Sequence, residues 1–164
     1  MGSNKNNKQG GHQARDPESR SSVPSIEDWS RLLDGRVAVV TGGGAGIGAA
    51  IAKLFAQHGA KVEIAEVSAE SGGAIADEIV AAGGVCRAHA IDVTAAADVE
   101  RLRTEVLGEH GGIDVLVNNV GDYRPLVRFG QSDPDSWRAM YDINLGHVFA
   151  VTRAFLAPMI EGGG

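Results

Sequence analysis

Cysteine is almost missing from this sequence of 164 residues: Cys86 carries the only thiol, so no disulfide can form within the chain. Cys86 lies in a segment with alternating apolar residues, which favours a small buried side chain over a catalytic thiol. Metal ligands are not indicated either. His58, His89, His110 and His147 show no ligand spacing, and we expect them at the surface or at helix ends.

Long apolar runs are also missing, since none approaches the roughly 18 residues of a membrane-spanning helix. Basic residues are outnumbered 15 to 21 by acidic ones, and the net charge of −6 argues against nucleic acid or an anionic membrane as a partner. With 43% hydrophobic and 22% charged residues, the chain has material for one domain.

Apolar periodicity is missing from the first 31 residues, which are rich in Gly, Asn, Gln, Ser and Lys. We therefore expect a disordered leader over residues 1–31 and a single domain over 32–164. The first residues superficially match a myristoylation signal, but Asn6 stands where serine or threonine is required. No hydrophobic signal region follows, so we expect the protein in the cytoplasm.

A glycine-rich segment over residues 41–48, TGGGAGIG, is the most informative feature that is present. It follows the apolar run 37–40 and opens a helical pattern of apolar residues. Strand, glycine turn and helix together bind phosphate, because glycines let a pyrophosphate approach the backbone and the helix start offers N–H groups and its dipole. The residues predicted to contact a dinucleotide in this segment are Gly42, Gly44, Gly46, Ile47 and Gly48. The alternative is a tight turn without a ligand.

Glu66 strengthens the prediction of a dinucleotide site. It ends the next apolar run, 20 positions past Gly46, where a carboxylate can accept hydrogen bonds from a ribose. Such a carboxylate repels a 2′-phosphate, and no basic residue stands in the glycine turn or just after Glu66, so NAD is favoured over NADP. The alternative is a solvated carboxylate at a strand end.

Strand and helix patterns alternate along the rest of the chain, which predicts a parallel sheet with helices on both faces. The expected strands cover 37–40, 62–66, 85–91 and 113–118, and the expected helices cover 69–82 and 95–109. Thr94 is a plausible N-cap, and Gly83 and Gly111 are expected helix stops. The third strand is polar and suits an edge, which predicts the order 3-2-1-4 with a ligand crevice between strands one and four.

The segment Ser132 to Asp135 has the signature of a helix start, and we expect one or two helices to follow as far as Ile160. Apolar residues occupy nearly every face from 140 to 159. The segment is therefore expected to be central or to lie at a subunit interface.

Four motifs in this order, the glycine turn, Asp92-Val93, the segment 118–121 (NNVG) and Asn144, resemble those of the classical short-chain dehydrogenase/reductase family. The resemblance runs from about Asp34 to the last residue. It implies an α/β doubly wound parallel sheet, the Rossmann fold, cut after the fourth strand and its following helix. The family usually has alanine where Val120 stands.

The resemblance also implies roles for residues after the third and fourth strands. Asp92 and Val93 are expected to contact the adenine, although Asp92 could instead be a charge near the start of the next helix. Asn118 and Asn119 are expected beside the adenosine ribose and Gly121 near the nicotinamide ribose. Ordinary turn formation is the alternative for both asparagines.

Asn144 is the one candidate for the chemistry itself. In the family it holds a water in a proton relay, whereas a core asparagine with satisfied amide groups is the alternative. The family's reaction also needs a serine and a Tyr-x-x-x-Lys pair, but Tyr123 is followed four positions later by Val127 and Tyr141 by Leu145.

The sequence therefore reads as the cofactor-binding part of an NAD(H)-dependent oxidoreductase that interconverts a secondary alcohol and a ketone, and we expect this chain alone to be inactive. The expected partners are a small alcohol or ketone and, in a full-length form, further copies of the chain. Two alternatives remain: a dinucleotide-binding module without catalysis and an S-adenosylmethionine-dependent methyltransferase.

Overall fold

The computed structural model describes residues 31–122 and 127–163. Four strands are present: β1 (Val37–Thr41), β2 (Lys61–Glu66), β3 (Val85–Ala90) and β4 (Val115–Val117). All pair in parallel in the order β3-β2-β1-β4, which confirms the predicted order. Apart from Arg31, the predicted leader 1–31 lies outside the described residues.

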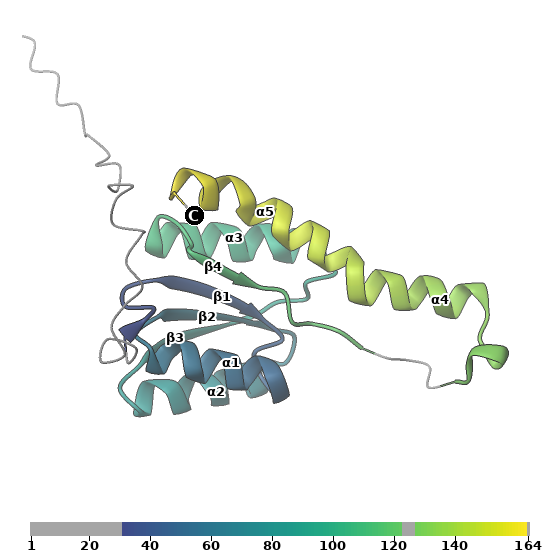
Figure 1. Ribbon diagram of the computed structural model, residues 1–164, viewed down its shortest axis with the longest axis horizontal. Coiled ribbons are helices and arrows are strands. Elements are labelled where there is room, and N and C mark those ends of the chain that lie inside the picture. The colour runs from purple at the N-terminus through teal and green to yellow at the C-terminus, as the bar shows by residue number, and fades with distance from the viewer. Residues whose placement is uncertain (1–30, 123–126, 164) are drawn as a thin grey trace, which may run out of the picture.

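Helices cover both faces of the sheet (Figure 1), with α1 and α2 on one side and α3 and α5 on the other. Their bounds are α1 (Gly46–Gln57), α2 (Ala69–Ala81), α3 (Ala96–His110), α4 (Pro134–Tyr141) and α5 (His147–Glu161). A 3-10 turn, η3 (Phe129–Gln131), precedes α4, and a π-helical turn, η4 (Asp142–Gly146), joins α4 to α5. The doubly wound α/β fold is thus confirmed as far as the fourth strand and its following helix.

Local signals explain three of the helix ends. Ser68 caps α2 by accepting from the N–H of Ser71 at 3.2 Å, and Asp133 forms a capping box with Ser136 at the start of α4. Gly111 ends α3 in the left-handed conformation, with φ at 73°. The prediction of Thr94 as an N-cap is wrong. The N-cap of α3 is Ala95, because the Thr94 hydroxyl instead donates to the Asp92 carboxylate at 2.7 Å.

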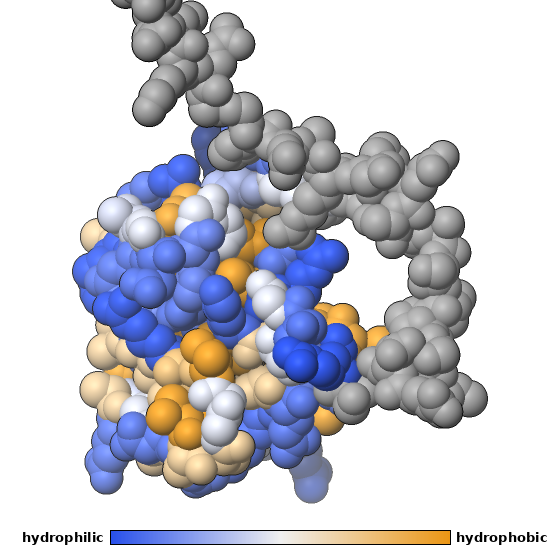
Figure 2. Space-filling model, turned by 90° about the vertical axis from the view of Figure 1, so that its left-hand side faces the viewer, coloured by the Kyte–Doolittle hydropathy of each residue, from blue (hydrophilic) through white to orange (hydrophobic). Residues whose placement is uncertain are grey.

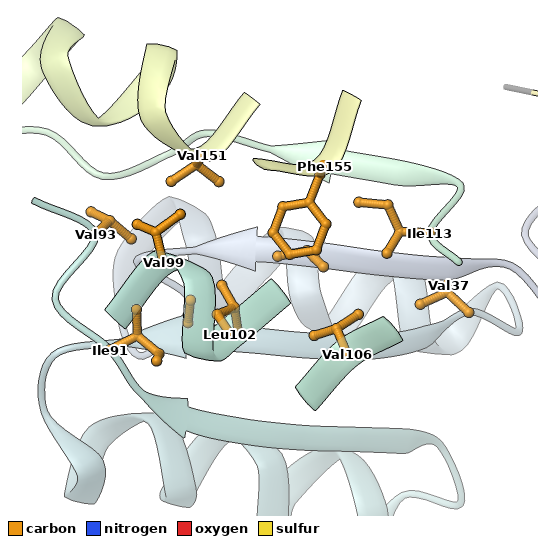
Figure 3. Packing of buried hydrophobic residues seen from close by; sticks show 11 residues of the cluster. Val37, Ile91, Val93, Val99, Leu102, Val106, Ile113, Val151 and Phe155 are labelled. Atoms are coloured by element: carbon orange, nitrogen blue, oxygen red, sulfur yellow. The ribbon is translucent and has the colours of Figure 1, made fainter. Parts of the chain in front are cut away.

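The core lies on both sides of the sheet. Under α3 and α5, the side chains of Val99, Leu102, Val106, Val151 and Phe155 pack together over the sheet (Figure 3). A second cluster fills the space between the sheet and α1 and α2. The inner strands β1 and β2 are almost continuously buried, which explains their unbroken apolar runs.

The fourth strand is shorter than the predicted 113–118. Ile113 is buried in the cluster under α3, and Asp114 makes two bonds with Val37, one through its backbone N–H and one through its carboxylate, both at 2.9 Å. Ladder pairing with β1 therefore begins only at Val115 and ends at Val117, leaving β4 as an edge of the described sheet.

Helical residues run without a break from Pro134 to Glu161, as the sequence predicts. The segment has 28 residues and is long and apolar enough to cross a membrane by length and composition, so the expectation that no apolar stretch approaches this length is wrong. One such helix is weak evidence for a membrane span, and 17% of its apolar window is buried within the chain. Within α5, the side chain of Phe155 is fully buried, whereas Phe149 is 69% exposed and Ile160 is 65% exposed. One face of α5 thus belongs to the core and the other is open in this chain.

The strands begin at the left-hand end of Figure 1, and Figure 2 shows the molecule from that end. Hydrophilic side chains dominate the upper part of this face, and hydrophobic ones are interspersed lower down. Apart from Asn144, which lies in η4, the predicted site residues lie at or just after the strand ends, at the opposite end of the sheet.

Candidate functional site

A cavity of about 670 Å³ opens where the four strands end. Six of the twelve predicted site residues line it: Gly42, Glu66, Asp92, Val93, Asn119 and Gly121. Parallel α/β sheets bind ligands at this edge, next to the point between β1 and β4 where the winding reverses. The remaining six, namely Gly44, Gly46, Ile47, Gly48, Asn118 and Asn144, are not among its lining residues.

The glycine turn between β1 and α1 depends on its glycines in two ways. Gly42 and Gly46 have φ of 65° and 53°, in the left-handed region that favours glycine. No side chain fits at position 48, because a Cβ on Gly48 would lie 2.1 Å from the Gly42 carbonyl oxygen and 2.6 Å from Nδ2 of Asn119. The first turn of α1 therefore packs directly against Gly42 and against Asn119, the second residue after β4.

The start of α1 is suited to an anion. Its N-cap, Ala45, has extended backbone with φ at −156° and provides no side-chain hydrogen bond. Ile47 follows at 74% exposure, so the helix start is open to solvent. Unpaired N–H groups and the helix dipole both favour a phosphate at such a position.

Glu66 is a half-buried carboxylate tied to the glycine turn. Its Oε2 accepts from the N–H of Gly44 at 3.1 Å, and its Oε1 accepts from the N–H of Ser68 at 3.3 Å. A Cβ at Gly44 would lie 2.7 Å from Cγ of Glu66, so the two residues are in close contact. These contacts hold a negative charge at the wall of the cavity.

Asp92 organises the turn that leads into α3. Its Oδ1 accepts from both the N–H and the hydroxyl of Thr94, at 2.9 and 2.7 Å, and its own N–H donates to Asp98 at 2.9 Å. Val93 is 4% exposed and belongs to the core cluster. These contacts keep Asp92 beside the start of α3, which suits the alternative of a charge near that helix start, and its contact with an adenine stays a prediction.

The turn after β4 is pinned to the end of β1. The hydroxyl of Thr41 accepts from the N–H of Asn119 at 2.9 Å, and Nδ2 of Asn119 donates to the carbonyls of Thr41 and Gly42, both at 3.1 Å. Asn118 points the other way, because its Nδ2 donates to Oγ1 of Thr152 on α5 at 3.1 Å. The paired asparagines thus join β4 to β1 on one side and to α5 on the other.

Asn144 lies in the π-helical turn η4, a kind of turn that is frequent at functional sites. Its Oδ1 accepts from the N–H of Asp122 at 3.1 Å, and its Nδ2 donates to the carbonyls of Asp122 and Met140, both at 2.8 Å. A Cβ at Gly121 would lie 2.9 Å from the same Oδ1. Both N–H groups of the amide and its oxygen thus have partners, although Asn144 is only partly buried, and the proton relay stays a prediction.

The expectation that these histidines lie at the surface or at helix ends is wrong for His89, which is part of β3, whereas His147 is the first residue of α5. His58 and His110 lie at helix ends, after α1 and as the last residue of α3. His89 and His147 are buried, at 5% and 1% exposure. Each has a distant hydrogen-bonding partner that local spacing does not reveal, a carboxylate for His89 and the Val120 carbonyl for His147.

A charged cluster, made of Glu63, His89, Glu105 and His110, lies between the sheet and α3. Glu63 bonds Nε2 of His89 at 2.5 Å and Nε2 of His110 at 2.6 Å, and Glu105 bonds Nδ1 of His89 at 2.7 Å. Arg101 lies 3.8 Å from Glu105. Within the described ranges, no group of three or more His, Cys, Asp or Glu side chains could hold a metal ion.

Hydrogen bonds and nearby charges outweigh burial in setting the pKa values of Glu63 and His89. Burial alone would raise the pKa of Glu63, but its bonds to His89 and His110 hold that pKa below the usual range. Burial alone would lower the pKa of His89, but its bonds to Glu63 and Glu105 raise that pKa instead. Nearby, burial and the charge of Glu63 raise the pKa of the Cys86 thiol to about 12.

Sequence and structure comparisons agree with the fold. The chain belongs to the short-chain dehydrogenase family, whose model matches residues 36–164. The chain is similar to D-threitol dehydrogenase of Mycolicibacterium smegmatis, with 38% identity over 137 residues, which cover 84% of this chain and 52% of that protein.

Two solved structures show the same similarity. One is a metagenomic short-chain oxidoreductase in complex with NADP, with 40% identity and a TM-score of 0.73, covering 79% of this chain and 58% of that one. The other is a 7α-hydroxysteroid dehydrogenase complexed with NADH and 7-oxo glycochenodeoxycholic acid, with 33% identity and a TM-score of 0.78, covering 86% and 54%. The chain thus spans about half the length of these proteins.

Proposed function

We propose that this protein is an NAD(H)-dependent oxidoreductase that interconverts a secondary alcohol and a ketone, and that residues 32–164 form its cofactor-binding domain. The observation that carries the proposal is the cavity at the strand ends, with the uncapped start of α1 beside it and the Glu66 carboxylate in its wall. Membership of the short-chain dehydrogenase family supports the reaction class and counts against a methyltransferase.

The choice of NAD over NADP rests on charge. The described lining of the cavity includes the acids Glu66, Asp92 and Asp122 and contains no lysine or arginine. A 2′-phosphate about 4 Å from a carboxylate meets a repulsion on the order of 1–4 kcal/mol per unit of charge, depending on screening. A difference of about 1.4 kcal/mol already changes the affinity tenfold. One similar structure holds NADP and another holds NADH, so family membership alone does not decide the cofactor. The proposed preference therefore rests on the residues of this chain.

The residues present fit a dinucleotide along the whole edge of the sheet. The backbone of Gly44, Gly46 and Ile47 would hold the pyrophosphate, and Gly48 leaves space for the close turn that this requires. Glu66 and Asn119 would lie beside the adenosine ribose, Asp92 and Val93 beside the adenine, and Gly121 beside the nicotinamide ribose. When bound, the cofactor supplies hydride transfer.

Catalysis needs more than these residues. Asn144 would hold a water for proton transfer, but the chain has no Tyr-x-x-x-Lys pair. General acid–base help is worth about 10² to 10⁴ in rate. We therefore expect the 164-residue chain to bind cofactor without turnover, which is also what the second candidate, a dinucleotide-binding module without catalysis, would do.

We also propose that the whole protein is cytoplasmic and oligomeric. The open face of α5 supports association, because Phe149, Leu156 and Ile160 are all at least 49% exposed there.

The test is a fluorescence titration of the chain with NADH and with NADPH, repeated for Glu66→Gln. We expect the wild-type chain to bind NADH at least tenfold more tightly than NADPH, and the variant to lose most of that preference. Tighter binding of NADPH by the wild-type chain would show that the role given to Glu66 is wrong. If neither NADH nor NADPH bound, the proposed function itself would be contradicted.

A further inference from the structure

His147 is a buried polar residue that the roles above do not use. It begins α5 and is 1% exposed. Its Nε2 lies 2.9 Å from the carbonyl oxygen of Val120, and because a carbonyl only accepts, Nε2 carries the proton. Within the described chain, Nδ1 has no hydrogen-bond partner. The bond to Val120 is therefore the polar contact that compensates for burying this ring.

The backbone of Val120 is held from two elements. Its N–H donates to the hydroxyl of Thr41 at the end of β1, at 3.3 Å, while its carbonyl accepts from His147 on α5. Two residues later, Asp122 bonds the Asn144 side chain through both its N–H and its carbonyl. The turn 120–122 is thus held by α5 at Val120 and by the π-helical turn η4 at Asp122.

Val120 and Gly121 both line the cavity, so the orientation of the peptide between them shapes its wall. We propose that His147 is a positioning residue of the cofactor site, which fixes the Val120–Gly121 peptide in the orientation that the bound dinucleotide needs. This inference rests on the proposed function. Without a donor at position 147, the Val120 carbonyl would lose this hydrogen bond. The turn would then shift so that the carbonyl could accept from another donor.

The test compares three variants of the 164-residue chain by NADH titration and thermal melting. His147→Leu removes the donor and keeps an apolar side chain in the core. His147→Gln keeps an amide N–H with about the reach of Nε2. Val151→Ala is the matched control, because Val151 is fully buried one turn further along α5 and belongs to the apolar cluster under that helix.

We expect His147→Leu to raise the NADH dissociation constant about threefold to tenfold, the effect of one net hydrogen bond, and His147→Gln to restore most of the loss. Val151→Ala should lower the melting temperature without changing NADH affinity. If His147→Leu binds NADH as the wild-type chain does, or if Val151→Ala weakens binding equally, the inference is wrong. A wild-type chain that does not bind NADH would instead contradict the proposed function.

Discussion

Replacing Glu63 with glutamine should destabilise the protein in a pH-dependent way. Glu63 has a side chain only 5% exposed and bonds two imidazoles, at 2.5 and 2.6 Å. A hydrogen bond to a charged group contributes about 1.5–3 kcal/mol and a neutral one about 1 kcal/mol. Glu63→Gln turns both charged hydrogen bonds into neutral ones. We therefore expect it to lower the free energy of unfolding by about 1–4 kcal/mol.

The pH dependence follows from the directions of the two pKa shifts. His89 has a raised pKa, so its contribution is complete below its ordinary 6.5 and is lost as the pH rises through the raised value. Glu63 has a lowered pKa, so its contribution is complete above its ordinary 4.5 and is lost as the pH falls through the lowered value. Both contributions are complete between pH 4.5 and 6.5.

Urea unfolding at about pH 5.5 and about pH 9 measures this effect. The wild-type protein should lose stability at the higher pH, and Glu63→Gln should lose less, because the bond that raises the pKa of His89 is weakened. Glu109→Gln is the control, since Glu109 is an exposed acid on α3, the helix that carries Glu105 and His110, and lies outside the charged cluster. If Glu63→Gln were as stable as the wild-type protein at the lower pH, the charged cluster would not stabilise the fold.

Two further outcomes test the glycine turn and the thiol. Gly48→Ala should abolish NADH binding and lower the melting temperature, because its Cβ would overlap the Gly42 carbonyl. The control is Gly73→Ala, at an open position in α2, which should stabilise that helix by about 0.5–1 kcal/mol. Equal behaviour of the two variants would contradict the steric argument. Cys86, with its pKa of about 12, should react with iodoacetamide far more slowly at neutral pH in the folded protein than in urea, and equal rates would contradict its burial.

The sheet order and the glycine turn could be predicted because the residue types that determine them are local. Buried inner strands need continuous apolar runs, and the polar third strand marks an edge. Gly42 and Gly46 occupy positive φ, where few other residues are tolerated. In each case, a backbone or burial requirement acts on the residue at that position, so a single sequence records it.

The contacts of the histidines could not be predicted in this way. His89 is buried because Glu63, 26 positions away, and Glu105, 16 positions away, both bond its ring. The spacing along the chain carries no signal for such contacts, since β2, β3 and α3 meet only in the folded protein. The short β4 has a similar cause, because the Asp114 carboxylate takes the Val37 N–H at the start of the ladder.

The hydrogen bonds of Glu66 have a consequence for redesigning the cofactor preference. The same carboxylate that would exclude a 2′-phosphate also accepts the N–H groups of Gly44 and Ser68, so it closes the glycine turn and the start of α2 together. An engineer who replaces it with a small or basic residue to admit the phosphorylated cofactor removes both acceptors at once. A successful conversion would have to return an acceptor to the turn as well as add a cation, and libraries that vary residue 66 alone should yield variants with relaxed preference and a looser turn.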